Sequence, residues 1–447
     1  MIPQLKSFGT LLALVLALTC LSAPGVQAAA PNRAMPGGLM DAFPAAAAQP
    51  FQTGAEGTLY AEQKVTAPDG VAEDWFGTAV ALDGDTALVG AYGDDVHGHD
   101  RQGSVYVFTR SGTTWSLQQQ LTASDGEQYA LFGLSVALSG STAVVGAPGD
   151  GPGSAYVFTR AGATWGERDK LTALDAEAGD YFGESVAIDG STILVGAYRD
   201  DIDANTDQGS AYVFAPSGLL NWEQEAKLIA EDGAATDAFG VSVALAGDTA
   251  LVGAYWDDVE GHENQGSAYV FTRQGATWTQ QAQLTAADGG ASDNFGYAVA
   301  LDGDTALVGA YWDLAATVFT GSEATWTQQA QLTAAGGVIE DYFGCAVALD
   351  GDTAVVGAYR DTVDTNQRQG SAYIFTRSGT TWTQEAQLTA SDGAAEDLFG
   401  DSVAVSGDTT LVGASSDDVD TNADQGSAYF FERLFAVYLP LVLRNAP

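Results

Sequence analysis

The sequence has few cysteines and few basic residues, and each shortage narrows the possible functions. Only two cysteines occur in 447 residues, Cys20 and Cys345. Cys20 lies in an N-terminal segment that we expect to be removed, so no intrachain disulfide can stabilise the mature chain. Lys and Arg number 16 against 58 Asp and Glu, a net charge of −42. Because phosphate binding needs a basic surface, we expect no nucleic acid partner.

Helical patterns and catalytic motifs are also missing. No long amphipathic helix is visible, and 54 glycines with 9 tryptophans are typical of a turn-rich all-β protein. The sequence contains no GxSxG, HExxH, P-loop or dinucleotide motif, and three histidines leave little for general-base catalysis. We therefore expect a protein that is not an enzyme. The alternative is a carbohydrate-active enzyme, a glycosidase or lyase, with carboxylates at a central channel.

The N-terminal segment has the features of an export signal. In residues 1–28, Lys6 precedes an apolar run that ends at Leu18, and Val26-Gln27-Ala28 forms a processing site. This predicts a secreted, extracellular or cell-surface protein. A lipidated Cys20 is the less favoured alternative, because Thr19 stands where a smaller residue usually precedes such a cysteine.

Two more segments flank the main body of the chain. Residues 29–56 are rich in Ala, Pro and Gly without periodicity, which predicts a disordered spacer. Residues 434–447 form a short apolar tail interrupted by Pro440, too short to span a membrane. A sorting or anchoring role for this tail and simple packing on the last repeat are both open.

Residues 57–433 consist of one unit repeated seven times. Repeats of about 50 residues mark solenoids or propellers. A Phe-Gly step marks each copy, at Phe76, Phe132, Phe182, Phe239, Phe295, Phe343 and Phe399. The fold therefore follows from a single unit.

Each unit predicts four short strands, as residues 237–286 illustrate. The strands are expected at 239–245, 249–254, 267–273 and 277–286, each bounded by Gly-rich turns. The second strand is a run of Ala, Leu and Val without alternation, as expected for a strand covered on both faces. Four such strands make one antiparallel blade.

The blades must stack, because a single blade has two apolar faces and cannot bury both. We predict an all-β, seven-bladed β-propeller of four-stranded antiparallel blades. The last unit lacks a fourth strand, whereas residues 59–67 align with the fourth strands of the other units, with Leu59 in the position of their Trp. We therefore expect the N-terminal strand to complete blade 7 and close the ring.

The recurring Phe-Gly, Val-Gly-Ala-Tyr and Gly-Ser-Ala-Tyr-Val-Phe segments resemble the FG-GAP repeat of the integrin α-subunit propeller, and bacterial FG-GAP proteins are the nearer match. The resemblance implies a binding or adhesion role. The calcium loop of integrins, of form DxDxDGxxD, lies between the first two strands of a blade, where this chain has short turns such as Gly303-Asp304. The metal ligands of the family are therefore not carried over.

Two loops after second strands predict a different calcium site. Both read D-x-D-x-N-x-D, and oxygen ligands on alternate residues of a tight loop suit Ca²⁺. The candidate ligands are Asp201, Asp203, Asn205, Asp207, Asp418, Asp420, Asn422 and Asp424. The Gly and Glu that an EF-hand has at its sixth and twelfth positions are absent, so two solvated loops are the alternative. We expect no cofactor besides Ca²⁺.

A line of aromatic residues follows the Gly-Ala step of several units. In a four-stranded meander the loops after second strands lie on the same face as the loops that join the blades, and the two sets together hold most of the acidic residues. In integrins, aromatic rings at this mouth hold a basic side chain of the partner subunit. The candidates are Tyr92, Tyr198, Tyr255, Trp256, Tyr311, Trp312 and Tyr359.

These aromatic residues predict a face that binds a protein or polysaccharide partner, either basic or bridged by a cation. The contacts would be cation–π interactions or stacking on sugars. Rings that simply cap the blade ends are the alternative. We expect a monomer without a transmembrane span.

Overall fold

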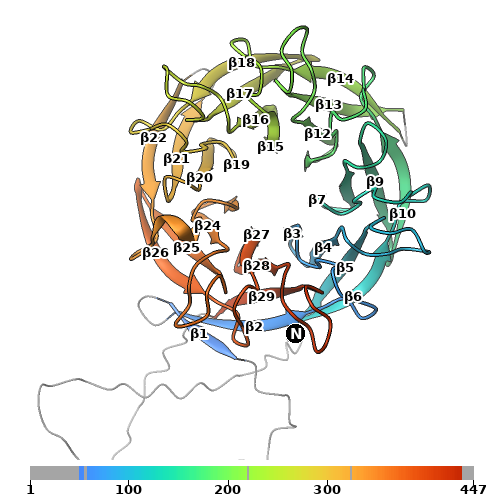
Figure 1. Ribbon diagram of the computed structural model, residues 1–447, viewed down its shortest axis with the longest axis vertical. Helices are drawn as coiled ribbons and strands as arrows, with labels where there is room; N and C mark the ends of the chain where they lie inside the picture. The colour runs from blue at the N-terminus through green and yellow to red at the C-terminus, as the bar shows by residue number, and fades with distance from the viewer. Residues whose placement is uncertain (1–49, 55–57, 219–220, 323–324, 435–447) are drawn as a thin grey trace, which may run out of the picture. The chain divides into compact units, whose positions relative to one another are not determined.

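The computed structural model describes residues 50–54, 58–218, 221–322 and 325–434, and these form a seven-bladed β-propeller (Figure 1). Each blade is an antiparallel sheet whose first strand lies nearest the central axis and whose fourth lies outermost. The predicted fold class is confirmed. The only helical element in the described residues is a 3₁₀ turn, η2 (Ile339–Asp341).

Strand bounds repeat closely from blade to blade, because the same turn residues bound every copy. Blade 1 contains β3 (Val80–Asp83), β4 (Thr86–Ala91), β5 (Ser104–Ser111) and β6 (Thr114–Leu121). Blade 2 contains β7 (Ser135–Ser139), β8 (Thr142–Ala147), β9 (Ser154–Ala161) and β10 (Thr164–Leu171). Blade 3 contains β11 (Ser185–Asp189), β12 (Thr192–Ala197), β13 (Ser210–Ser217) and β14 (Asn221–Leu228). Blade 4 contains β15 (Phe239–Ala246), β16 (Thr249–Ala254), β17 (Ser267–Gln274) and β18 (Thr277–Leu284). Blade 5 contains β19 (Ala298–Asp302), β20 (Thr305–Ala310), β21 (Ala315–Ser322) and β22 (Thr325–Leu332). Blade 6 contains β23 (Val347–Asp350), β24 (Thr353–Ala358), β25 (Ser371–Ser378) and β26 (Thr381–Leu388).

Blade 7 combines the two ends of the propeller. Its strands β27 (Phe399–Ser406), β28 (Thr409–Ala414) and β29 (Ser427–Leu434) are continued by β2 (Leu59–Val65), which pairs antiparallel with β29 (Figure 1). The register places Val65 opposite Ala428. Closure of the ring by the N-terminal strand is therefore confirmed.

Two details at the closure differ from the sequence analysis. A short strand, β1 (Phe51–Thr53), pairs with β2 and adds a fifth strand within the range predicted as spacer. Tyr60, not Leu59, occupies the Trp position, because Tyr60 lies opposite Arg433 as Trp115 lies opposite Arg110. The alignment missed this by one residue because Leu59 and Tyr60 are both large and apolar.

The core lies in the seams between neighbouring blades. The Phe of each Phe-Gly step is fully buried, and Phe76 packs edge-on against Tyr106 of the third strand, with ring centroids 5.3 Å apart. The Gly that follows Phe76 has a φ of 98°, and a Cβ on Gly77 would lie 2.3 Å from the Ser427 carbonyl oxygen. The Phe-Gly step is thus the point where one blade's backbone meets the next.

The other predicted segments lie largely outside the described residues. These are the signal peptide at 1–28, the tail beyond Leu434 and all of the spacer except residues 50–54. Within the described part of the chain, no helix has the length and apolar character needed to cross a membrane.

Candidate functional site

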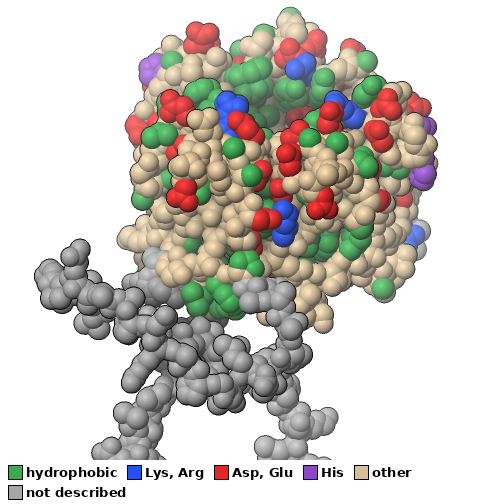
Figure 2. Space-filling view, turned by 60° about the horizontal axis from the view of Figure 1, so that its bottom comes forward, with side chains coloured by type: hydrophobic (Ala, Val, Ile, Leu, Met, Phe, Trp, Pro, Cys, Tyr) green, Lys and Arg blue, Asp and Glu red, His purple; other side chains and the backbone are tan. Residues whose placement is uncertain are grey.

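One face of the propeller is built from two sets of loops, and we call it the loop face. It comprises the loops after second strands, such as residues 92–103, and the loops between blades, such as residues 122–134. The two sets are joined by backbone hydrogen bonds: the Phe132 N–H donates to the Gln102 carbonyl at 2.9 Å, and Phe239 donates to Gln208 at 2.9 Å. In Figure 2, Asp and Glu side chains are spread over the upper part of the view, with Lys and Arg between them.

The seven predicted aromatic residues all lie on the loop face, directly after a second strand. In blades 4 to 6 the structure brings five of them into one series of ring contacts together with two further rings, Tyr297 and Tyr342. We call these seven residues the mouth aromatics: Tyr255, Trp256, Tyr297, Tyr311, Trp312, Tyr342 and Tyr359. The remaining two, Tyr92 and Tyr198, pair separately with Trp75 and Tyr181.

Tyr297 links the rings of blade 4 to those of blade 5. Its ring centroid lies 5.5 Å from that of Tyr255 and 4.7 Å from that of Tyr311. Tyr342 continues the series into blade 6, at 4.9 Å from Trp312 and 5.5 Å from Tyr359. The series therefore crosses three blades without a break.

Arginines of the chain itself already stack on some of these rings. Arg199 lies over Tyr181 and Tyr198, with its guanidinium carbon 4.9 and 5.2 Å from the ring centroids. Arg360 lies 4.2 Å from the centroid of Tyr342. Among the described residues no such cation lies over the mouth aromatics of blades 4 and 5. These rings are also the exposed ones, with Trp256 at 38% and Trp312 at 39%.

Sequence reasoning missed Tyr297 and Tyr342. They flank Phe-Gly steps, one directly after Phe295-Gly296 and one directly before Phe343. Comparing the residues next to the Phe-Gly step in all seven copies would have found both tyrosines. The residues beside the Phe-Gly step differ between the seven copies, and only some of them are aromatic. The series of ring contacts was therefore visible only in the structure.

The position after the Phe-Gly step also carries acids in two other blades. Burial raises the pKa of Glu184 in blade 3 and of Asp401 in blade 7 to about 7. Oδ1 of Asp401 has no hydrogen-bond partner among the described residues. Burial likewise raises the pKa of the Cys345 thiol to about 12, so this cysteine is a buried thiol.

The D-x-D-x-N-x-D loops have their own internal hydrogen bonds. Asp201 accepts a bond from the Asp207 backbone N–H at 2.9 Å, and Asp418 accepts one from Asp424 at 3.0 Å. Asp203 lies in a left-handed turn, with a φ of 55°, and its side chain is exposed. Among the described residues no group of three or more His, Cys, Asp or Glu is arranged to hold a metal. The predicted calcium sites stay a prediction.

The Asn of each such loop anchors it to the loop that joins the blades. Asn205 Nδ2 donates to the Gly233 carbonyl at 3.2 Å, and Asn422 Nδ2 donates to that of Gly70 at 3.1 Å. At the same place in blade 1, His99 Nδ1 lies 3.0 Å from the Gly126 carbonyl. Asn and His replace one another here because each places a nitrogen donor at the δ position.

Seven FG-GAP repeats are recognised along the sequence, over residues 60–108, 115–158, 165–214, 222–271, 278–322, 326–375 and 382–431. These ranges cover most of the chain. The chain belongs to the FG-GAP repeat family. The FG-GAP propeller is also similar in fold to the crystal structure of the RRP9 WD40 repeats, with 12% identity, a TM-score of 0.52, and coverage of 86% of this chain and 100% of that one. No curated protein matches the sequence.

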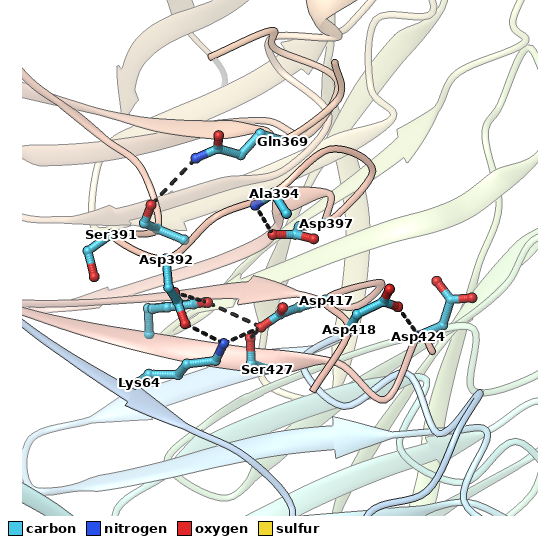
Figure 3. A network of polar contacts seen from close by, with 12 residues as sticks. Lys64, Gln369, Ser391, Asp392, Ala394, Asp397, Asp417, Asp418, Asp424 and Ser427 are labelled. Carbon is cyan, nitrogen blue, oxygen red and sulfur yellow. Dashed lines mark hydrogen bonds and ion pairs between the residues drawn. The ribbon is translucent and has the colours of Figure 1, made fainter. Parts of the chain in front are cut away.

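The FG-GAP propeller carries a polar cluster that recurs in several blades. At its centre are two aspartates, one from the loop that precedes the blade and one from the loop after its second strand, which we call the acid pair. In blade 7, Lys64 Nζ lies 2.7 Å from Asp392 and 2.6 Å from Asp417 (Figure 3). Tyr429 donates a hydrogen bond to the same two acids, and Ser427 donates one to Asp417. The sequence analysis did not predict this cluster, because its members come from three separate segments.

Blades 2 and 3 have the same arrangement as blade 7. Lys170 lies 2.7 Å from both Asp125 and Asp150, and Lys227 lies 2.6 Å from Asp175 and 2.7 Å from Asp200. The lysines hold the pKa of Asp125, Asp175 and Asp392 below its ordinary value, against the effect of their partial burial. Three of the seven blades thus neutralise an acid pair with a lysine of the outer strand.

Proposed function

We propose that this FG-GAP propeller is a secreted or cell-surface, non-catalytic binding module that holds its partner through the mouth aromatics. The observation that supports this is the unbroken ring series of blades 4 to 6, in which Trp256, Tyr297 and Trp312 are each more than a third exposed. A β-propeller of FG-GAP repeats is suited to binding. Clustered exposed aromatic rings mark interaction surfaces on soluble proteins.

The chemistry of the site favours a partner that offers Lys or Arg side chains. Blades 3 and 6 already hold Arg199 and Arg360 against rings of the same face, so its geometry accommodates a guanidinium group. The rings of blades 4 and 5 are left for a group from outside. A net charge of −42 attracts a basic partner and raises its association rate.

Ca²⁺ is the cofactor that we propose for the D-x-D-x-N-x-D loops, where a bound ion would bridge the loop face to an acidic partner group. Asp203 and Asp420 are exposed there. If both loops bind Ca²⁺, calorimetry will show two sites that are lost when Asp203 and Asp420 are replaced by Asn. Export is tested separately, by finding a mature chain that begins at Ala29 in the culture medium or on the cell surface.

Peptide titration tests the proposed binding. The probes are acetylated tetra-arginine and tetra-lysine amides and the neutral sugar cellohexaose, followed by tryptophan fluorescence and calorimetry. We expect the peptides to bind, and Trp256→Ala and Trp312→Ala each to weaken them about 5- to 30-fold, which corresponds to about 1–2 kcal/mol per cation–π contact.

Leu174→Ala is the matched control, because Leu174 is 85% exposed and does not belong to the mouth aromatics. This variant should bind like the unmodified protein. Binding of peptides that is unchanged in both Trp variants would assign the attraction to surface acids alone and refute the proposed site. Cellohexaose binding without peptide binding would show that the rings stack on sugars instead.

A further inference from the structure

Blade 5 has an acid pair without a lysine. Asp288 and Asp313 occupy the positions that Asp125 and Asp150 have in blade 2, and Gln331 replaces the lysine. Gln331 Nε2 lies 3.3 Å from Asp288 Oδ2 and 3.2 Å from Asp313 Oδ2. One amide therefore stands between two carboxylates, where an ammonium group stands in blades 2, 3 and 7.

Blade 5 has also lost the hydroxyl donors of the cluster. Ala315 replaces the Ser that bonds the second acid elsewhere, such as Ser267 with Asp257 at 2.5 Å. Thr317 replaces the Tyr. Asp313 is left with the weak amide bond of Gln331 as its only side-chain hydrogen bond among the described residues.

The Thr317 hydroxyl is a buried polar group beside the acid pair of blade 5 in the sheet register. Thr317 lies directly opposite Gln331 in the sheet, as Tyr156 lies opposite Lys170, so both side chains project from the same side of the blade. Thr317 is 1% exposed, and its Oγ1 has no hydrogen-bond partner among the described residues. A buried hydroxyl without a partner is costly, and a bound group that it contacts removes this cost.

The local charge favours a cation. Burial, then Asp293 and Asp288, raise the pKa of Asp313 to about 6. In blades 2, 3 and 7, by contrast, a lysine and a Tyr hydroxyl lower the pKa of the first acid of the pair, against the raising effect of burial. The site is open to solvent, since Asp288 and Gln331 are exposed and blade 5 has no loop between β20 and β21 long enough to cover them.

We propose that the acid pair of blade 5 binds a hard divalent cation of the Ca²⁺ type at the position that a lysine ammonium takes in blades 2, 3 and 7. Carboxylate oxygens of Asp288 and Asp313, the Gln331 amide oxygen after rotation of the amide, and the Thr317 hydroxyl supply oxygen ligands, and water completes the shell. This site is separate from the D-x-D-x-N-x-D loops and from the mouth aromatics.

The other blades explain why only blade 5 has this site. In blades 1 and 4 a Tyr hydroxyl bonds the second acid, Tyr106 to Asp94 at 3.3 Å and Tyr269 to Asp257 at 2.9 Å, and the Tyr ring occupies the space beside it. In blade 6 the first acid is absent, because Gly336 stands in its place. Blade 6 therefore provides a matched control.

The test introduces a lysine at position 331, so that its ammonium group occupies the proposed cation site. Gln331→Lys and, as control, Gln387→Lys in blade 6 are made in a background in which Asp203→Asn and Asp420→Asn remove the other candidate sites. Ca²⁺ affinity is measured by calorimetry, and Tb³⁺ by its luminescence, for which the neighbouring Trp312 is the sensitiser. Melting temperatures are measured in EDTA, in millimolar CaCl₂ and in NaCl of equal ionic strength.

We expect the background protein and Gln387→Lys to bind one Ca²⁺ and to melt higher in CaCl₂ than in NaCl. Gln331→Lys should lose at least tenfold in Ca²⁺ affinity, lose the Tb³⁺ signal and melt at the same temperature in CaCl₂ as in NaCl of equal ionic strength. In EDTA it should melt about 1–3 °C above the background, because the new ion pair replaces the bound cation. Undiminished Ca²⁺ binding by Gln331→Lys, or no Ca²⁺ binding by the background protein, would overturn the proposal.

Discussion

Blade 7 and blade 5 depart from the repeat in opposite ways. Blade 7 is assembled from two distant parts of the chain, yet its polar cluster is complete: Lys64 holds Asp392 and Asp417, and Glu62 accepts a hydrogen bond from the Ser391 hydroxyl at 2.7 Å. Blade 5 is continuous in sequence, yet its cluster has lost the lysine, the Tyr and the Ser. Both keep the full strand pairing.

The comparison separates two sources of stability. The second strand of each blade is apolar and almost fully buried, and it keeps this character in both cases. The polar cluster ties the outer strand to the loop that precedes the blade, and it is present in blade 7, where no peptide link holds that strand to β29, as well as in blades 2 and 3. We infer that the cluster matters most at the closure, and three experiments test this difference.

The largest effect is expected from deletion of residues 1–65, which removes β1 and β2. The outer strand of blade 7 then disappears, Tyr60 no longer fills its buried position, and β29 becomes a free edge. A loss well above about 5 kcal/mol is expected, together with edge-to-edge association. Calorimetry and size-exclusion chromatography measure both effects.

Deletion of residues 1–49 is the control, since it keeps both strands, and its melting temperature should equal that of the full chain. A 66–447 fragment that melts like the full chain and stays monomeric would show that closure does not stabilise the ring.

A smaller loss is expected from Lys64→Met. The Asp417 side chain is only 8% exposed, and removing its partner leaves a buried charge uncompensated, at a cost of about 2–3 kcal/mol. Lys64 and a Tyr hydroxyl hold the pKa of Asp392 below 3.8, against its partial burial, so the stability it contributes is present above pH 4 and is lost as pH falls through its folded value. The gap between Lys64→Met and the unmodified protein should therefore close below pH 4.

Gln331→Met in blade 5 is the matched change, because it removes only a weak amide contact, and it should cost less than about 1 kcal/mol. Urea unfolding at several pH values compares the two. Equal losses for both variants would contradict a special role of the cluster at the closure.

The smallest effect concerns the residue after the Phe-Gly step, which is Asp401 in blade 7 and Tyr297 in blade 5. Burial raises the pKa of Asp401 to about 7, so the folded state binds its proton more tightly than the unfolded state does. Its stability contribution is full at acidic pH and declines as pH rises from about 4 through 7. Asp401→Asn should lie close to the unmodified protein at pH 4 and be the more stable of the two by at least about 1 kcal/mol at pH 8.

Asp420→Asn serves as the control for this pH dependence, since Asp420 is exposed, and its melting curve should follow that of the unmodified protein across the range. A difference between Asp401→Asn and the unmodified protein that is constant from pH 5 to pH 8 would show that Asp401 does not titrate in this interval.

The fold was predictable because its information is local and repeated. Turn residues and apolar runs in 237–286 predicted four strands, and β15 to β18 lie within two residues of those ranges. The closure followed from the missing fourth strand of the last unit. The one-residue error at Tyr60 arose because no Trp marks the register there.

The site was only partly predictable, because its contacts join different units. Five of the seven mouth aromatics were found from their position after the Gly-Ala step, whereas Tyr297 and Tyr342 enter through ring contacts across seams. The pairing of Lys64 with Asp392 joins residues 328 positions apart, which no local pattern indicates. The acidic loops suggested metal ligands, while the structure shows that Asp201 accepts a hydrogen bond from the backbone of its own loop and Asn205 donates one to the loop that joins the blades.

Closure by the first strand also has a consequence for the order in which the chain is made. Val65 is synthesised before any residue of blades 1 to 6, and its partner Ala428 follows roughly 360 residues later. At about 5–20 residues per second this takes about 20–70 s, during which the edge of β2 that pairs with β29 has no partner. Blades 1 to 6 can form one after another as they leave the ribosome, but the ring stays open until β29 has been synthesised. The N-terminal strand of a nascent chain is therefore the part most exposed to mispairing.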